Sequence, residues 1–178
     1  DVTFGKRSSF LGVNADFYGF QEAVKDPNIN LMLDYISENI SKKFIIYGEI
    51  FGGNIQKEVF YGPKRVRFYD LYITDGEDGY FYDSCVAMKI FTDFNLSVPL
   101  LAIDVEFNEA LNHRNDFIST LTPSDYVNKD NNICEGIVIK PMYGNYISPN
   151  GERFVIKSKN AKFSEKKKSE TIKCDGFS

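Results

Sequence analysis

The sequence is poor in the residues on which hydrolase and metal sites depend, with one histidine and three cysteines among 178 residues. Cys85, Cys134 and Cys174 are odd in number and lack the spacing of metal ligands, and His113 alone cannot complete a zinc site. Without a supporting motif, this histidine builds no Ser/His/Asp or Cys/His arrangement. Free cysteines are typical of a reducing compartment, so we expect an intracellular, cytoplasmic protein, including one encoded by a virus or a phage.

Long apolar runs and glycine-rich nucleotide loops are also missing. The longest apolar segments, such as residues 98–103, are far shorter than the ~20 residues that span a bilayer, and no charged region precedes an apolar one as in a signal peptide. The phosphate-loop and dinucleotide glycine patterns are absent. We therefore expect a soluble protein that does not act at membranes.

The residues that are present suffice for one hydrophobic core, with 43% hydrophobic residues, 16 Phe and 11 Tyr. No repeat, low-complexity segment or Gly/Pro-rich linker divides the chain, which predicts a single domain over residues 1–178. The net charge of -4 argues against a protein that coats nucleic acid by bulk electrostatics. The lysine-rich residues 157–173 nevertheless predict a local basic surface, although such a run is also typical of a solvated tail.

Apolar residues at helical spacing predict two amphipathic helices, the first of them capped at Asn28. Their apolar positions are Ile29, Met32, Leu33, Ile36 and Ile40 in one and Ala87, Ile90, Phe91 and Phe94 in the other. β-Branched and aromatic residues predict strands over 43–51, 65–74, 136–140 and 153–159. A tight turn at Asn150-Gly151 would make the last two an antiparallel hairpin. This pattern favours an α+β domain over regular βαβ alternation.

Charged residues interrupt two of these apolar strands. Glu49 is flanked by glycines, which allow a ligand or another backbone to approach closely, and a buried carboxylate there would need a partner. A strand-end glutamate that faces water is the alternative. Glu135 and Lys140 flank residues 136–139, and alternation places them on opposite faces unless the strand twists or bulges near Gly136.

Further cations lie in the last strand and near the start of the chain. Period-two alternation places Lys157 and Lys159 on one face, where they could hold a phosphate or simply be solvated. Lys6 and Arg7, followed by two serines, have a composition suited to phosphate or ribose hydroxyls.

Five segments in order, GKRSSFL, IIYGEIFGG, RFYDLYI, EGIVIKP and VIKSKNAKFSEKKK, resemble the successive motifs of covalent nucleotidyltransferases. The last is similar to that of ATP-dependent RNA ligases of the phage RNA ligase 2 type, with the kinetoplastid RNA-editing ligases as more distant relatives. The resemblance covers nearly the whole chain. It implies a nucleotidyltransferase (ATP-grasp-like ligase) domain of the α+β class, with mixed, mainly antiparallel sheets flanked by helices and the nucleotide between them.

The resemblance further implies a function. Such ligases join RNA 3′-OH and 5′-phosphate ends through lysyl-AMP and AMP-RNA intermediates, here at nicks in duplex RNA during repair or editing. ATP and Mg²⁺ or Mn²⁺ are the implied cofactors, and RNA is the implied partner. A DNA ligase, an mRNA-capping-type nucleotidyltransferase and a non-catalytic nucleotide- or RNA-binding module are the alternatives.

Site residues follow from the resemblance by position. The implied nucleotide-binding set is Lys6, Arg7, Glu49, Tyr69, Asp70, Glu135, Val138, Lys140, Lys157 and Lys159. Within it, the implied catalytic residues are Arg7, Glu135, Lys157 and Lys159. The resemblance also implies that Glu49 binds the ribose, that the Tyr69 ring stacks on adenine, and that Glu49 and Glu135 meet the divalent cation through water. The implied RNA contacts are Gln56, Lys166, Lys167 and Lys168.

One motif of the family is not found where the resemblance places it. The nucleophile of these ligases lies in a Lys-x-x-Gly motif upstream of GKRSS, and no such motif precedes Gly5 here. Lys173-Cys-Asp-Gly176 has the spacing but the wrong position, as expected of a chance match. We therefore expect the chain to be part of a longer protein, without the nucleophile segment and the C-terminal domain of the family.

Overall fold

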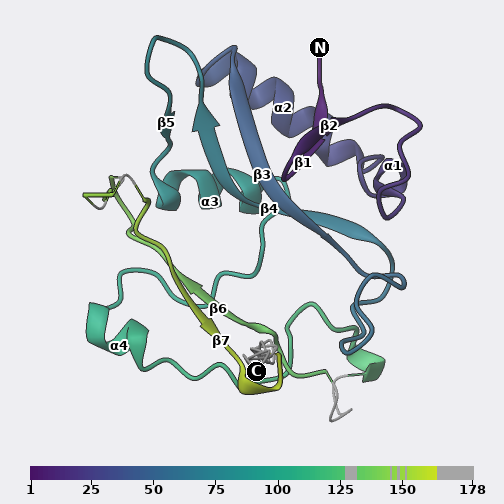
Figure 1. Cartoon of the computed structure of the whole chain (residues 1–178), viewed down its shortest axis with the longest axis vertical. Helices are drawn as coiled ribbons and strands as arrows, with labels where there is room; N and C mark the ends of the chain where they lie inside the picture. The colour runs from purple at the N-terminus through teal and green to yellow at the C-terminus, as the bar shows by residue number, and fades with distance from the viewer. Residues whose placement is uncertain (127–131, 145, 148, 151, 164–178) are drawn as a thin grey trace, which may run out of the picture.

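The computed structural model describes residues 1–126, 132–144, 146–147, 149–150 and 152–163. In chain order the strands and α-helices are β1 (Phe4–Lys6), β2 (Ser9–Leu11), α1 (Phe20–Ala23), α2 (Pro27–Asn39), β3 (Phe44–Phe51), β4 (Arg65–Ile73), β5 (Tyr80–Phe81), α3 (Ser84–Asp93), α4 (Phe107–Leu111), β6 (Gly136–Ile139) and β7 (Ile156–Lys159), with short 3-10 helices at Ser124–Tyr126 and Ala161–Phe163. The described strands form antiparallel sheets β1–β2, β3–β4–β5 and β6–β7 (Figure 1). A mixed α+β architecture with small antiparallel sheets is thereby confirmed.

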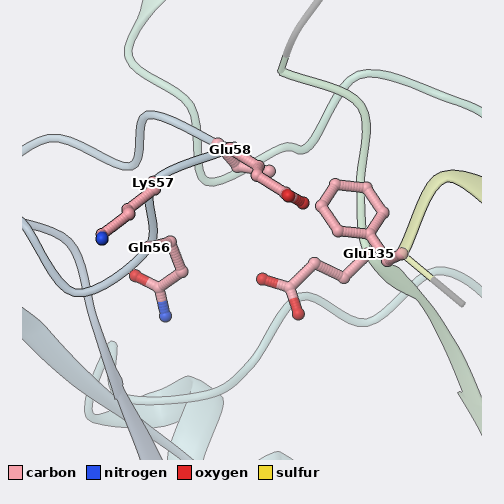
Figure 2. A pocket seen from close by; sticks show the side chains of 6 residues that line it. Gln56, Lys57, Glu58 and Glu135 are labelled. Carbon is pink, nitrogen blue, oxygen red and sulfur yellow. The ribbon is translucent and has the colours of Figure 1, made fainter. Parts of the chain in front are cut away.

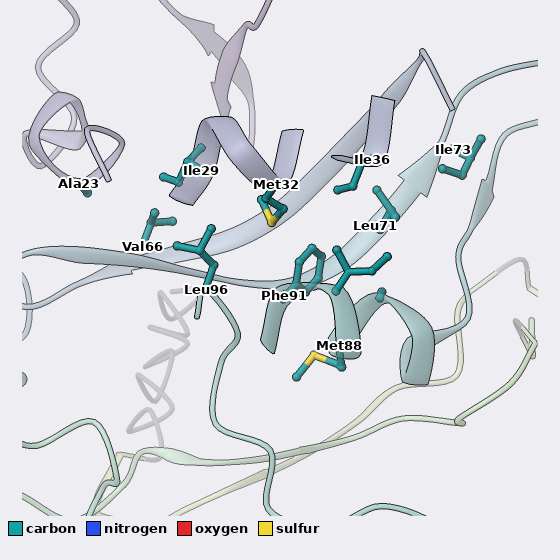
Figure 3. Close-up of a cluster of buried hydrophobic side chains, with 12 residues drawn as sticks. Ala23, Ile29, Met32, Ile36, Val66, Leu71, Ile73, Met88, Phe91 and Leu96 are labelled. Carbon is teal, nitrogen blue, oxygen red and sulfur yellow. The ribbon is translucent and has the colours of Figure 1, made fainter. Parts of the chain in front are cut away.

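The core lies between two helices and the largest of these sheets (Figure 3). α2 and α3 are the two predicted helices, and their apolar side chains form one cluster with the inner face of β3 and β4. Met32, Ile36, Leu71 and Phe91 are completely buried in this cluster. Burying each such side chain stabilises the fold by about 1.5–3 kcal/mol.

The first of these helices begins earlier than predicted. Asp26, not Asn28, is the N-cap of α2, and its side chain accepts a hydrogen bond from the Asn28 backbone N–H at 3.0 Å. Pro27 occupies the first helical position, where its fixed φ suits a helix and its missing N–H costs nothing. None of the helices formed by the described residues has the length and apolarity needed to cross a membrane.

A β-bulge interrupts the pairing of β3 and β4. In β3, Tyr47 pairs with Asp70 and Gly48 pairs with Phe68. Tyr69, between the two residues of β4, therefore has no paired residue in β3. The extra residue reverses the alternation of β4, because Phe68 and then Leu71 both pack in the core. Asp70 consequently lies on the sheet face opposite the helices.

Gly48 is the residue that allows this bulge. A Cβ atom at Gly48 would lie 2.6 Å from the carbonyl oxygen of Arg67 and 2.6 Å from the ring of Phe68. Both distances are shorter than any ordinary contact between non-bonded heavy atoms. The close approach predicted for a glycine here is therefore made by the partner strand of the same sheet.

The β6–β7 hairpin lies below β3–β4 in the view of Figure 1, and side chains that flank its strands bind the face of β3–β4 that the helices leave open. Gly136 pairs with Lys159 and Val138 with Lys157, which confirms the predicted antiparallel pairing. Gly151 of the predicted turn lies outside the described residues. Ile137 of β6 is buried, but neither hydrophobic cluster of the described residues includes a residue of β6 or β7, and polar contacts join this hairpin to β4.

We expect Gly48→Ala to destabilise the fold by about 1–3 kcal/mol, because the added methyl group overlaps atoms of β4 that are fixed by the core. Gly12→Ala is the matched control, since a Cβ atom at Gly12 meets nothing within 4 Å. The urea midpoints of both variants, followed by circular dichroism, measure the difference. Equal midpoints would show that the bulge accepts a side chain at this position.

Candidate active site

Two carboxylates and one ammonium group from separate parts of the chain lie within electrostatic reach of one another. Glu49 is on the outer face of β3, Glu135 directly precedes β6, and Lys157 belongs to β7. Glu49 is exposed by surface area, yet the protein atoms around its carboxyl group disfavour the charged form. This desolvation and the negative charge of Glu135 raise the pKa of Glu49, while Lys157 acts in the opposite direction. The structure thus brings together three residues that the sequence assigns to one site.

Tyr61 joins this group without having been predicted. Its hydroxyl group donates a hydrogen bond to Oε1 of Glu135 at 3.4 Å, and its ring packs edge-on against Phe51 with centroids 5.5 Å apart. Burial, followed by the charge of Glu135, raises the pKa of Tyr61, so the hydroxyl stays protonated and remains a donor. Tyr61 lies in the connection between β3 and β4, outside every motif, and only tertiary contact brings it to Glu135.

Asp70 is the centre of a buried ionic cluster. Nζ of Lys140 donates to Oδ1 of Asp70 at 2.9 Å and to the backbone carbonyl of Tyr69 at 2.7 Å. The Arg153 guanidinium donates to both Asp70 oxygens, at 2.8 and 2.9 Å. The side chains of Asp70, Lys140 and Arg153 are 12%, 14% and 19% exposed. Asp70 and Lys140, both predicted to bind nucleotide, are thus engaged with each other, and Arg153 was not predicted.

Tyr69 lies beside this cluster and within electrostatic reach of Glu49. Its side chain is partly buried, and the Lys140 ammonium group lies 5.7 Å from the centroid of its ring. Burial, and then the charge of Glu49, raises the pKa of Tyr69. The ring predicted to stack on a base therefore adjoins the Glu49 carboxylate.

Lys157 and Lys159 occupy one face of β7, as the alternation predicts. Both are exposed, whereas Ile156 and Ser158 are partly buried. Val138, opposite Lys157 on β6, is 55% exposed and shares this face. Neither lysine forms an ion pair within the part of the chain that the structure describes. Two exposed cations at this spacing, neither of them held in a salt bridge by the described residues, suit an anionic ligand.

Amide side chains hold the end of the hairpin nearest Glu135. The backbone N–H of Asn160 donates to the Glu135 carbonyl at 2.9 Å, and its Nδ2 donates to the Asn115 carbonyl at 2.9 Å. Nδ2 of Asn115 in turn donates to Oγ of Ser158 at 2.9 Å. These bonds fix the entry to β6 and the exit from β7, which carry Glu135 and Lys159.

A pocket of about 310 Å³ opens beside Glu135 (Figure 2). Its lining residues are Gln56, Lys57, Glu58, Val59, Glu135 and Phe163. Figure 2 shows the side chains of Gln56 and Glu135 directed into the same space. Oε1 of Gln56 also accepts a hydrogen bond from the Gly52 backbone N–H at 3.0 Å. Gln56, predicted to contact RNA, therefore both closes its own loop and lines this pocket.

The remaining predicted residues form no ion pair with the two glutamates or lie outside the described residues. Lys6 and Arg7 are exposed on β1–β2 and at its turn, and within the described residues neither forms an ion pair with Glu49 or Glu135. Lys166, Lys167 and Lys168 lie outside the described residues, as does the Lys173-Cys-Asp-Gly176 segment. Among the residues that are described, no three His, Cys, Asp or Glu side chains form a group that could hold a metal ion.

A known protein family matches the chain over the segments on both sides of the site. Residues 1–159 match the family model described as RNA ligase. The matched residues contain Glu49, Tyr61, Asp70, Glu135 and both β7 lysines.

We expect Glu49→Gln to raise the melting temperature at pH 8 and to leave it nearly unchanged at pH 4.5. A carboxyl group with a raised pKa in the folded state contributes stability at low pH that is lost as the pH rises through that folded pKa. The neutral amide removes this loss. Glu77→Gln in the exposed loop before β5 is the control. A Glu49→Gln variant that is less stable than the parent at pH 8 would contradict the prediction.

Proposed function

The chain belongs to the RNA ligase family, and from this premise we propose that it forms the adenylyltransferase domain of an ATP-dependent enzyme that joins RNA 3′-hydroxyl and 5′-phosphate ends. The observation that carries the proposal is that Glu135 and Lys157, from two other segments of the chain, lie within electrostatic reach of Glu49. Bringing two like charges together and partly desolvating them costs free energy, and such groups are typical of ligand-binding and catalytic sites.

The described residues fit an adenine nucleotide in chemistry and charge. Lys157 and Lys159 are exposed and form no ion pair among the described residues, which suits them to the α-phosphate. Glu49 can accept hydrogen bonds from ribose hydroxyl groups, and Tyr69 offers an aromatic face to the base. Val138, exposed on the same face as Lys157, adds an apolar contact.

The two carboxylates could supply part of the coordination of a divalent cation such as Mg²⁺ or Mn²⁺. Burial and then repulsion from Glu135 raise the pKa of Glu49, and a bound cation would relieve the repulsion. Two carboxylates are too few for a dedicated protein cage, so water and phosphate oxygens would complete the coordination, as is usual for Mg²⁺. When bound, the cation supplies charge neutralisation at the phosphate oxygens.

The reaction proposed is three successive displacements at phosphorus. A lysine amine, supplied by a Lys-x-x-Gly motif preceding Gly5, attacks the α-phosphorus of ATP and releases pyrophosphate, giving lysyl-AMP. The RNA 5′-phosphate then takes AMP from the lysine, and the 3′-hydroxyl attacks the activated phosphate and releases AMP. Lys157 and Lys159 stabilise the negative charge that grows on the α-phosphate oxygens in the first two steps.

Nicked duplex RNA is the substrate that we propose, with discrimination from DNA through contacts to the 2′-hydroxyl groups. The test uses the protein extended through its Lys-x-x-Gly segment and compares sealing of an RNA nick, sealing of a DNA nick and covalent labelling by GTP. We expect RNA sealing with ATP to exceed the other two activities. Preferential DNA sealing or GTP labelling would assign the chain to a DNA ligase or a capping-type enzyme. Failure of all three would favour a non-catalytic binding module.

We expect Lys157→Ala and Lys159→Ala each to reduce AMP transfer to the extended protein on the order of 100-fold, because each removes a cation from the α-phosphate. Lys89→Ala is the control, since Lys89 is an exposed cation paired with Asp93 on α3. Intact mass spectrometry after incubation with ATP and Mg²⁺, without RNA, measures the transfer. Equal rates for the β7 variants and the control would remove the two lysines from the site.

A further inference from the structure

The Arg153 side chain links the two sheets on either side of the candidate site. Its guanidinium forms two hydrogen bonds with Asp70 of β4, at 2.8 and 2.9 Å, and lies 3.9 Å from the ring centroid of Phe81 in β5. Phe81 also packs edge-on against Tyr72 of β4, with centroids 4.9 Å apart. One side chain from the hairpin segment therefore contacts two strands of the larger sheet.

Lys140 approaches the same carboxylate from the other arm of the hairpin. Lys140 follows β6 directly, and Arg153 comes shortly before β7. Asp70 thus binds both arms of the hairpin at one end, while Asn115, Asn160 and the Tyr61–Glu135 contact hold the other end. A hairpin fixed at both ends has a defined separation from β3 and β4.

Arginine suits this position better than lysine would. Its planar guanidinium satisfies both carboxylate oxygens at once and stacks on an aromatic ring at the same time, which an ammonium group cannot do. The Asp70 carboxylate is already shared with Lys140, so the cluster carries an excess positive charge. Stacking on Phe81 compensates part of the cost of burying the second cation.

We propose that Arg153 is a positioning residue that sets the separation between the β7 lysines and the Glu49–Tyr69 side of the site. The proposal rests on the proposed nucleotide-binding function of that site. Lys157 follows Arg153 closely along the same segment, so a shift of the Arg153 end displaces the cation intended for the phosphate. Arg153 acts through Asp70 and Phe81 and does not itself contact the nucleotide.

The test compares Arg153→Lys and Arg153→Met with Arg114→Met, which removes an exposed arginine paired with Asp116. AMP binding to each variant is measured by calorimetry at a temperature at which circular dichroism shows the variant to be folded. We expect Arg153→Met to weaken AMP binding roughly 10- to 100-fold, since small displacements of binding groups have large effects. Arg153→Lys should recover part of this loss, and Arg114→Met should bind like the parent. Parent-like AMP affinity in folded Arg153→Met would overturn the proposal.

A second measurement separates this inference from the proposed function. Amide hydrogen exchange in β6 and β7 should be faster in Arg153→Met and in Phe81→Leu than in the parent, while exchange in α3 stays unchanged. If the parent chain binds no AMP, the proposed function fails, yet the exchange result still tests whether Arg153 holds the hairpin. Unchanged exchange in β6 and β7 in both variants would refute the positioning role whatever the nucleotide result.

Discussion

The shared carboxylate of Asp70 is the interaction on which the arrangement of the candidate site depends. Helices α2 and α3 pack with one face of β3 and β4, and the hydrophobic clusters of the described residues leave out the β6–β7 hairpin. Asp70 joins that hairpin to the sheet through Lys140 and Arg153. Removing Asp70 would leave two largely buried cations without their shared carboxylate, which is strongly destabilising even where the intact cluster adds little net stability.

Asp70 can reach the hairpin only because the strand pairing is irregular. With regular alternation, Asp70 would share the face of Phe68, which packs against the core. The bulge at Tyr69 turns Asp70 to the other face, and the absence of a side chain at Gly48 makes room for it. The local geometry of two paired strands thus determines where a carboxylate and, through it, a distant hairpin are placed.

Much of the secondary structure was predictable because it depends on periodic patterns within single segments. The spacing of Met32 and Ile36 predicted α2, and the alternation of Lys157 and Lys159 predicted their shared face, both of which the structure confirms. The cap of α2 was assigned wrongly to Asn28, since Asp26 and Pro27 supply the stronger signal. The described residues also confirm the antiparallel pairing of β6 with β7.

Features that depend on contacts between distant segments could not be read from the sequence. Tyr61 and Arg153 belong to no motif, and only folding brings Tyr61 to Glu135 and Arg153 to Asp70. The alternation of side chains along a strand placed Glu135 and Lys140 on opposite faces, so the sequence did not show how both could reach one site. In the structure Glu135 lies near Glu49, while Lys140 binds Asp70. The roles assigned to these residues by family resemblance remain predictions.

The separation of the hairpin from the hydrophobic clusters bears on how such a domain can evolve. Outward-facing residues of β6 and β7, such as Val138, contribute little to the packing that keeps α2 and α3 on the sheet. Most destabilising substitutions act through buried cores, so mutations on this outer face carry a smaller stability penalty. Ligand preference can therefore diverge by changes within the hairpin, while the core and the Asp70 anchor are inherited unchanged.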